Sequence, residues 1–152
     1  MIMKEIQKYP DINSIVGFAS NKKLPGKFAS LQLMPYTLKE YLGLLAKSRI
    51  AIYVRGLHDC LSFKFGHLLS LGLPIVGQTI HNNKDKIMDN RYFDNQFAFD
   101  DPKEIVQEVI KVLAKPEKLM TLGSSNAKVF DEKFTPKAVV SDILCHLNIT
   151  EQ

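Results

Sequence analysis

Residues 50–76 read IAIYVRGLHDCLSFKFGHLLSLGLPIV, and this stretch decides the fold class that the sequence predicts. Its first five residues form a continuous β-branched and apolar run, as expected of a strand buried on both faces of a parallel sheet. A turn at residues 55–60 leads into a helix predicted over residues 62–71, which Gly72 ends, and a short strand follows at residues 74–76. The order strand, loop, helix, strand is typical of a layered α/β domain.

Short apolar runs and turn residues precede this unit. Residues 12–18 (INSIVGF) predict a strand, residues 22–27 a loop, and residues 28–33 a second strand. Residues 37–40 (TLKE) have the spacing of a capping box, in which the Thr hydroxyl and the Glu carboxylate satisfy backbone amides. A helix is therefore predicted from there to about Lys47.

Three helices are predicted after the central unit. Residues 101–104 (DPKE) supply an N-cap, a Pro at the first helical position and a Glu in the first turn, and apolar residues follow at helical spacing through residue 113. A second helix is predicted over residues 117–130, and a third begins at Pro136. Since no repeat, low-complexity tract or linker separates these segments, residues 1–152 are predicted to form one α/β domain.

Composition excludes several classes of protein. The hydrophobic fraction of 45% and the charged fraction of 24% are ordinary for a soluble globular domain. The longest apolar stretch, residues 68–76, is interrupted by Ser, Gly and Pro and is shorter than the ~20 residues of a membrane span. Charges near the start, where a secretory signal needs an apolar run, predict a cytoplasmic protein. Cys60 and Cys145 are expected to be reduced thiols that pack in the domain.

The net charge is slightly positive. Twenty basic and sixteen acidic residues give +4, but the lysines are scattered along the chain and mixed with acids. This pattern does not predict a nucleic-acid partner. A mild positive field would help an anionic small molecule or an anionic membrane surface to approach, so peripheral membrane association stays open.

The turn after the buried strand is the predicted binding site, because ligands of open α/β sheets bind outside the carboxyl ends of the strands. The backbone amides of Leu61, Ser62 and Phe63 are expected to point into this crevice and, with the helix dipole, to hold phosphate oxygens. Lys64 adds a cation, and Asp59 offers an acceptor for sugar hydroxyls. These groups together suit a nucleoside-diphosphate sugar.

Residues 62–76 resemble the S-x-K-x-x-E-x-x-x-x-G-x-P-hydrophobic signature of glycosyltransferases with the GT-B fold, especially those of the glycosyltransferase 4-like, or group 1, family. His67 stands where the signature has Glu, and Asp59 lies eight residues earlier, where these enzymes carry another acid. The resemblance implies that Asp59 and Gly56 contact the donor sugar and diphosphate, and that His67 meets the ribose. It also implies a Rossmann-like, three-layer domain with a parallel sheet.

The same resemblance extends more weakly over most of the chain. Residues 36–54 and 99–147 look like the helix and strand before the site and the closing helices of the family. Met34, Pro35 and Tyr36 then follow the strand whose end meets the nucleotide base, so their backbone groups are expected to contact the base. No D-x-D triplet occurs, which fits metal-independent transfer without a cofactor.

The resemblance further implies that the chain is the C-terminal, donor-binding half of a two-domain transferase. Residues 4–10 look like the end of the first helix, so the first strand and its basic residue are expected to be missing. The N-terminal domain, which carries the catalytic base and binds a glycan, lipid-linked or other acceptor, is expected to be missing as well. No catalytic residue is assigned, and this polypeptide alone is expected not to turn over substrate.

Other interpretations stay open. A sugar-nucleotide 2-epimerase-like enzyme would also bind phosphates at such a helix, but it needs further acid and base residues that the sequence does not offer. His67 favours a non-catalytic, degenerate donor domain. A carboxylate can accept hydrogen bonds from two ribose hydroxyls, whereas a neutral imidazole has only one acceptor atom.

Simpler roles compete for the individual residues. His67 would alternatively be a partly buried histidine bonded to a backbone carbonyl, Asp59 a plain helix cap and Lys64 a solvated lysine. No metal site is expected, since His58, Cys60 and His67 have no fourth partner at a typical ligand spacing. Residues 81–83 (His-Asn-Asn) are predicted to form a polar loop over the same edge.

Overall fold

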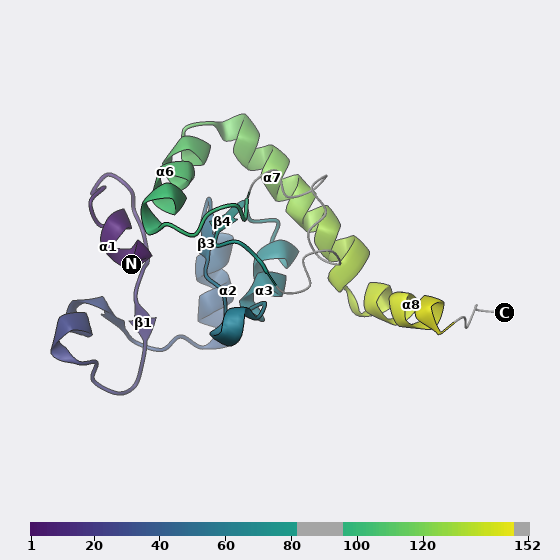
Figure 1. Cartoon of the computed structure of the whole chain (residues 1–152), viewed down its shortest axis with the longest axis horizontal. Coiled ribbons are helices and arrows are strands. Elements are labelled where there is room, and N and C mark those ends of the chain that lie inside the picture. The colour runs from purple at the N-terminus through teal and green to yellow at the C-terminus, as the bar shows by residue number, and fades with distance from the viewer. Residues whose placement is uncertain (82–95, 148–152) are drawn as a thin grey trace.

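A pair of parallel strands lies at the centre of the protein (Figure 1). In the computed structural model, which describes residues 1–81 and 96–147, β3 (Ala51–Tyr53) pairs with β4 (Ile75–Gly77). Tyr53 lies opposite Gly77, where a Cβ atom would stand 2.5 Å from the Tyr53 carbonyl oxygen, so only glycine permits this approach. Both strands agree with the predictions to within one residue.

Helices cover both faces of the β3–β4 pair. Alternate residues along a strand point to opposite sides, so each face contributes its own buried residues. On one face, Tyr53 and Ile75 share a buried cluster with Phe65 of α3 (Lys64–Ser70). On the other face, Val76 shares a second cluster with Ile105, Val109 and Val112 of α6 (Pro102–Leu113). The burial on two faces that the apolar run predicted is confirmed, and this part of the chain is a layered α/β structure.

A buried pair of amide side chains joins α7 (Pro116–Val129) to the start of β4. The Asn126 amide, which is fully buried, donates to the Leu73 carbonyl at 2.6 Å and to Gln96 Oε1 at 3.0 Å. Gln96 Nε2 returns a hydrogen bond to Asn126 Oδ1 at 3.1 Å, and the Ile75 amide donates to Gln96 Oε1 at 3.0 Å. Because these polar groups are paired with one another, their burial adds specificity to the packing of α7.

The end of α3 also packs closely against α7. Gly72 has a φ of +59°, the left-handed conformation that commonly follows a helix, which confirms the predicted end of this helix. A Cβ atom on Gly123 would lie 2.6 Å from the Gly72 carbonyl oxygen. The two backbones therefore approach to a distance that no larger residue at position 123 would permit.

The C-terminal segments are helical, as predicted. Asp101 caps α6 through the Lys103 amide at 2.8 Å, and Thr135 caps α8 (Pro136–His146) through the Ala138 amide at 3.2 Å. A π-helical turn, η3 (Phe130–Phe134), connects α7 to α8. In Figure 1, α8 projects away from the strands and the other helices. Across residues 1–81 and 96–147, no helix has the length and apolar character needed to cross a membrane.

The N-terminal part differs from the prediction. The strand predicted over residues 12–18 is present only as β1 (Phe18–Ala19), and the one predicted over residues 28–33 only as β2 (Gln32–Leu33). These two strands pair in parallel, but they form a small sheet separate from β3 and β4 in the described part of the chain.

The physical reason is local. The Phe28 amide donates to the Pro25 carbonyl at 2.8 Å, which starts a 3-10 helix, η1 (Gly26–Leu31), in place of a strand. Ile15 is exposed, so the predicted apolar alternation of the first strand has no partner that buries it. The first helix, α1 (Ile2–Ile6), ends within residues 4–10, where its end was predicted.

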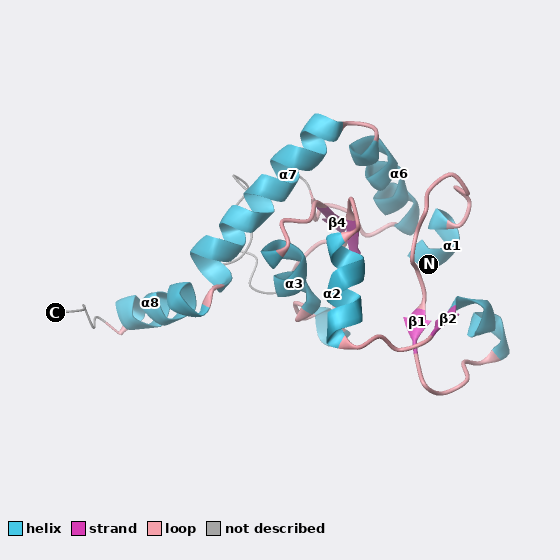
Figure 2. Ribbon diagram, turned by 180° about the vertical axis from the view of Figure 1, so that it is seen from behind, coloured by secondary structure: helices cyan, strands magenta, loops and turns pink. Residues whose placement is uncertain are grey.

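Figure 2 shows the helix α2 (Leu38–Ala46), and the capping box predicted at its start is confirmed. The Thr37 hydroxyl accepts from the Glu40 amide at 3.3 Å, and the Glu40 carboxylate accepts from the Thr37 amide at 2.8 Å. The hydrogen bond from the Thr37 backbone amide, followed by that from its hydroxyl, holds the pKa of Glu40 below its ordinary value.

Replacing Asn126 by Ala is expected to lower the free energy of unfolding by about 2 to 3 kcal/mol, because it removes three buried hydrogen bonds and leaves a cavity. Urea unfolding followed by circular dichroism measures the change. Ser124→Ala, at an exposed position on the same helix, is the matched control and is expected to change little. A loss equal to that of the control would contradict the role assigned to the amide pair.

The capping box predicts a pH dependence of stability. The pKa of Glu40 is lower in the folded than in the unfolded chain, so its contribution is fully present above the ordinary value of 4.5 and is lost as the pH falls through the folded-state value. Comparing the unfolding free energies of the wild type and Glu40→Gln from pH 7 to pH 3 is expected to show a difference that shrinks in the acid range. A difference that is constant with pH would contradict the assignment.

Candidate functional site

The connection from β3 to α3 forms the candidate site at the carboxyl ends of both central strands. β4 ends at the same edge, because parallel strands place their carboxyl ends together. The Arg55 amide, two residues beyond β3, donates to the side-chain Oε1 of Gln78, just beyond β4, at 3.1 Å. The Gln78 amide in turn donates to the Tyr53 carbonyl at 3.2 Å, so the first residues of the loop are held against β4.

The loop itself is compact and takes an unusual backbone path. The Gly56 amide donates to the Cys60 carbonyl at 2.9 Å, and a Cβ atom at Gly56 would lie 2.7 Å from Cys60 Sγ. His58 and Asp59, with φ of 54° and 59°, both adopt the left-handed conformation that non-glycine residues rarely take. Each such residue costs about 1 to 3 kcal/mol, which surrounding contacts must offset. Asp59 is the last residue of a distorted 3-10 turn, η2 (Leu57–Asp59), and Phe63 rather than Asp59 is the N-cap residue of α3.

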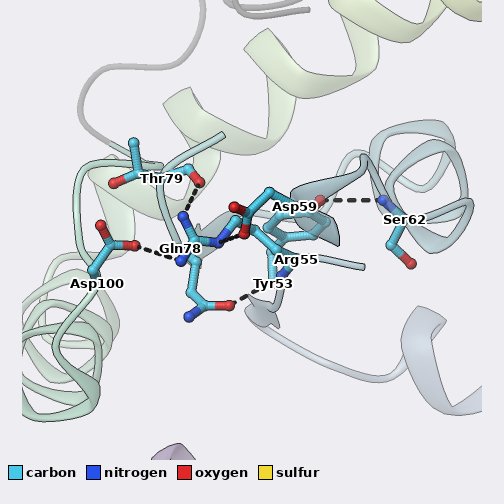
Figure 3. A network of polar contacts seen from close by, with 7 residues as sticks. All are labelled: Tyr53, Arg55, Asp59, Ser62, Gln78, Thr79 and Asp100. Atoms are coloured by element: carbon cyan, nitrogen blue, oxygen red, sulfur yellow. Dashed lines mark hydrogen bonds and ion pairs between the residues drawn. The ribbon is translucent and has the colours of Figure 1, made fainter. Parts of the chain in front are cut away.

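Arg55 is the centre of a polar network that holds this turn (Figure 3). Its Nε atom lies 3.2 Å from Asp59 Oδ1, and its Nη2 atom lies 3.3 Å from Asp100 Oδ1. Its Nη1 donates to the Thr79 carbonyl at 3.4 Å. The Arg55 side chain is 19% exposed, whereas the side chains of Asp59 and Asp100 are 57% and 54% exposed. The guanidinium thus sits at the surface of the loop between two solvated acids.

The amides predicted to face the crevice are only partly available. The helix begins at Lys64 rather than at Ser62. The Ser62 amide was expected to be free for a ligand, but it donates to the Tyr53 hydroxyl at 3.2 Å. The amides of Leu61 and Phe63 have no hydrogen-bond acceptor among residues 1–81 and 96–147. Burial raises the pKa of the Tyr53 phenol, so it remains a neutral hydrogen-bonding group.

His67 packs between two aromatic rings. Its ring centroid lies 6.0 Å from that of Tyr41 on α2 and 6.0 Å from that of Phe63. Its Nδ1 atom is buried and has no hydrogen-bond partner in the described part of the chain. The backbone-carbonyl partner considered from the sequence is therefore not found at Nδ1. Phe63 itself is 78% exposed and forms the outer surface of this aromatic group.

The remaining predicted site residues lie at varying distances from the loop. Lys64, in the first turn of α3, is exposed and has no ion-pair partner within the described ranges. Met34, Pro35 and Tyr36 are exposed in the segment between β2 and α2. Within the described residues, no hydrogen bond or ring contact joins them to the loop.

A shallow depression does lie beside the predicted base-binding segment. It has a volume of about 330 Å³, and none of the loop residues lines it. The residues that line it are Tyr36, Glu40, Gly43, Leu44 and Lys47. The structure therefore groups Gly56 and Asp59 with Arg55, while the segment assigned to the base opens onto a different hollow.

Other predictions concern cysteines and metal ligands. Cys60 and Cys145 are free thiols, but both are exposed, so the expectation that they pack inside the domain is wrong. In the portion of the chain that the structure describes, no three His, Cys, Asp or Glu side chains gather into a set that would hold a metal ion. His81 is exposed, and the other two residues of the predicted polar loop, Asn82 and Asn83, lie outside the described residues.

The sequence pointed to the loop but not to its network. The sequence assigns no contact to Arg55, although a basic residue that follows a buried strand stands at the edge where α/β domains bind ligands. Asp100 carries no such signal, because it reaches Arg55 only through the parallel bridge between Gln78 and Phe99. The Ser62 to Tyr53 hydrogen bond likewise depends on the packing of the Tyr53 ring against Phe65 at a centroid distance of 5.6 Å.

Comparison of the chain with models of protein families, with curated proteins and with solved structures finds no significant match.

Replacing Tyr53 by Phe is expected to release the Ser62 amide and to lower the free energy of unfolding by about 0.5 to 1.5 kcal/mol. The readouts are chemical denaturation and the exchange rate of the Ser62 amide proton, which is expected to increase. Tyr41→Phe is the matched control, since no hydrogen bond of its hydroxyl is found in the described residues. An unchanged Ser62 exchange rate would contradict the bond.

Proposed function

We propose that this chain is the donor-binding half of a metal-independent GT-B glycosyltransferase, which transfers a sugar from a nucleoside-diphosphate sugar to an acceptor. In this proposal the domain is Rossmann-like and cytoplasmic. A separate N-terminal domain supplies the catalytic base and the site for a glycan, lipid-linked or other acceptor.

The observation that carries the proposal is the position of the loop between β3 and α3. Parallel strands β3 and β4 end beside it, with a helix on each face of the pair, and this edge is where α/β domains bind nucleotides. The loop brings Asp59 and Arg55 within 3.2 Å of each other, and Lys64 follows at the start of α3. Acceptors for hydroxyl groups and cations for phosphate oxygens are thus available on one short segment.

The spacing of residues 62–76 gives independent support. In this chain the Ser, Lys, Gly and Pro of the glycosyltransferase signature correspond to Ser62, Lys64, Gly72 and Pro74. Gly72 is required by its left-handed φ, and Pro74 leads into β4, so part of the match follows from the local fold alone. Ser62 also has a local role, because its hydroxyl oxygen accepts from the Lys64 amide at 3.4 Å. The exposed side chain of Lys64 has no such role, which makes Lys64 the informative part of the match.

A second candidate function is a binding or scaffold module that does not transfer sugar. The observation that favours it is the environment of His67, whose ring packs between Tyr41 and Phe63 with Nδ1 buried. A carboxylate at this position would accept two ribose hydroxyls, whereas the packed imidazole presents fewer acceptors. This candidate predicts that common nucleotides do not bind at the loop.

A heteronuclear NMR titration tests the donor proposal. Uridine, guanosine and adenosine diphosphates and their sugar conjugates are added to the labelled chain, and at least one is expected to shift the amide signals of residues 61–67. Lys64→Gln is expected to weaken that binding about threefold to tenfold, since it removes one exposed cation near a phosphate. Lys137→Gln, an equal change of charge on the projecting helix α8, is the control. Absence of any shift at millimolar nucleotide would refute the donor proposal and favour the module.

A further inference from the structure

The guanidinium of Arg55 does not form a bidentate pair with either of its two carboxylate partners. Its Nε and Nη2 atoms form the side of the group that binds one oxyanion through two parallel hydrogen bonds. In the structure that side is divided between two different carboxylates, each contributing a single oxygen, at 3.2 Å from Asp59 and 3.3 Å from Asp100 (Figure 3). Both distances exceed the ~2.7 to 2.9 Å of a strong charge-assisted bond.

The two ion pairs are also weakly held. More than half of each aspartate side chain is exposed, so water competes for both carboxylates. Exposed pairs of this kind contribute little to stability. The backbone of the loop is fixed independently, by the Arg55 amide on Gln78 and by the Gly56 amide on Cys60. The side chain of Arg55 is therefore able to change partners without unfolding the loop.

We propose that Arg55 binds a phosphoryl group of the ligand through its Nε and Nη2 side, and that Asp59 and Asp100 occupy this side when no ligand is bound. This inference rests on the proposed function and deepens it, because it assigns the principal diphosphate-binding side chain. One phosphate offers two oxygens to the same side of the guanidinium, which neither carboxylate does in the structure.

The exchange of partners at Arg55 links binding of the diphosphate to recognition of the attached sugar. When a phosphate takes the place of Asp59, the Asp59 Oδ1 atom leaves Arg55 and becomes an acceptor for a hydroxyl of the attached sugar. Before the ligand binds, the Asp59 Oδ1 atom lies beside the guanidinium, 3.2 Å from Arg55 Nε. Binding of the diphosphate thereby prepares the group that recognises the sugar.

The two acids also oppose an incoming anion. Asp100 contributes a negative charge beside the site but, unlike Asp59, has no assigned contact with the ligand. Removing that charge is therefore expected to strengthen phosphate binding, although it removes an ion pair from the folded protein. A purely structural Arg55 predicts only a change in stability.

Isothermal titration of the full chain with pyrophosphate, uridine diphosphate, its sugar conjugates and plain uridine tests the inference, together with the Nε–Hε NMR signal of Arg55. Phosphate-bearing ligands, but not uridine, are expected to shift that signal. Asp100→Asn is expected to tighten their binding about twofold to fivefold, and Arg55→Gln to weaken it about tenfold or more. Asp142→Asn on α8 and Arg49→Gln, which precedes β3 at its opposite end, are the charge-matched controls and are expected to leave binding unchanged.

The outcomes separate this inference from the donor proposal. If nucleotides shift the amides of residues 61–67 but leave the Arg55 signal and the affinity of Asp100→Asn unchanged, the assignment of Arg55 is wrong and the donor site stands. If pyrophosphate shifts the Arg55 signal but no nucleotide or nucleotide sugar binds more tightly than pyrophosphate, the anion site stands and the donor proposal is wrong. Should Arg55→Gln fail to fold, the Asp100→Asn titration decides alone.

Discussion

The parallel pairing of β3 with β4 is the constraint on which the rest of the structure depends. It requires Gly77 opposite the Tyr53 carbonyl, since a Cβ atom there would clash with that oxygen at 2.5 Å. The pairing places Tyr53 and Ile75 on one face with α3, and Val76 on the other with α6. It also brings the two strand ends together, so that Gln78 holds the backbone of Arg55. The packing of the core and the position of the candidate site thus both depend on the pairing of β3 with β4.

The packed region is held by buried hydrogen bonds, whereas the loop at its edge carries exposed ion pairs. The Gln96 and Asn126 amides bond each other and the backbone before β4 in a fully buried setting, where each lost hydrogen bond is costly. The loop instead combines two left-handed residues with exposed ion pairs, whose individual strength is low. A rigid support beneath an adjustable loop is a common arrangement for binding sites.

The aromatic group around His67 gives the candidate site its most unusual feature. Tyr41 belongs to α2 and Phe63 is the residue before α3, so the ring of His67 packs between α2 and the start of α3. The exposed face of Phe63 continues this aromatic surface outward. Within the proposed donor-binding role, the position that holds an acid in the signature has become part of the packing between α2 and α3.

The sequence by itself determined the local elements: the Thr37 and Glu40 capping box, the helices begun by Pro102 and Pro136, and the apolar strand before Arg55. Each depends on residues a few positions apart, whose propensities act within one turn or one strand. Only the tertiary structure decided that Ile15 in the predicted first strand stays exposed, that Tyr53 accepts a hydrogen bond from the Ser62 amide and that Asp100 pairs with Arg55. These depend on side chains far apart in sequence or on burial of a weak strand, and no local pattern encodes them. Residues 62–76 therefore predicted where the candidate site lies, while the partners of Arg55 came from the fold.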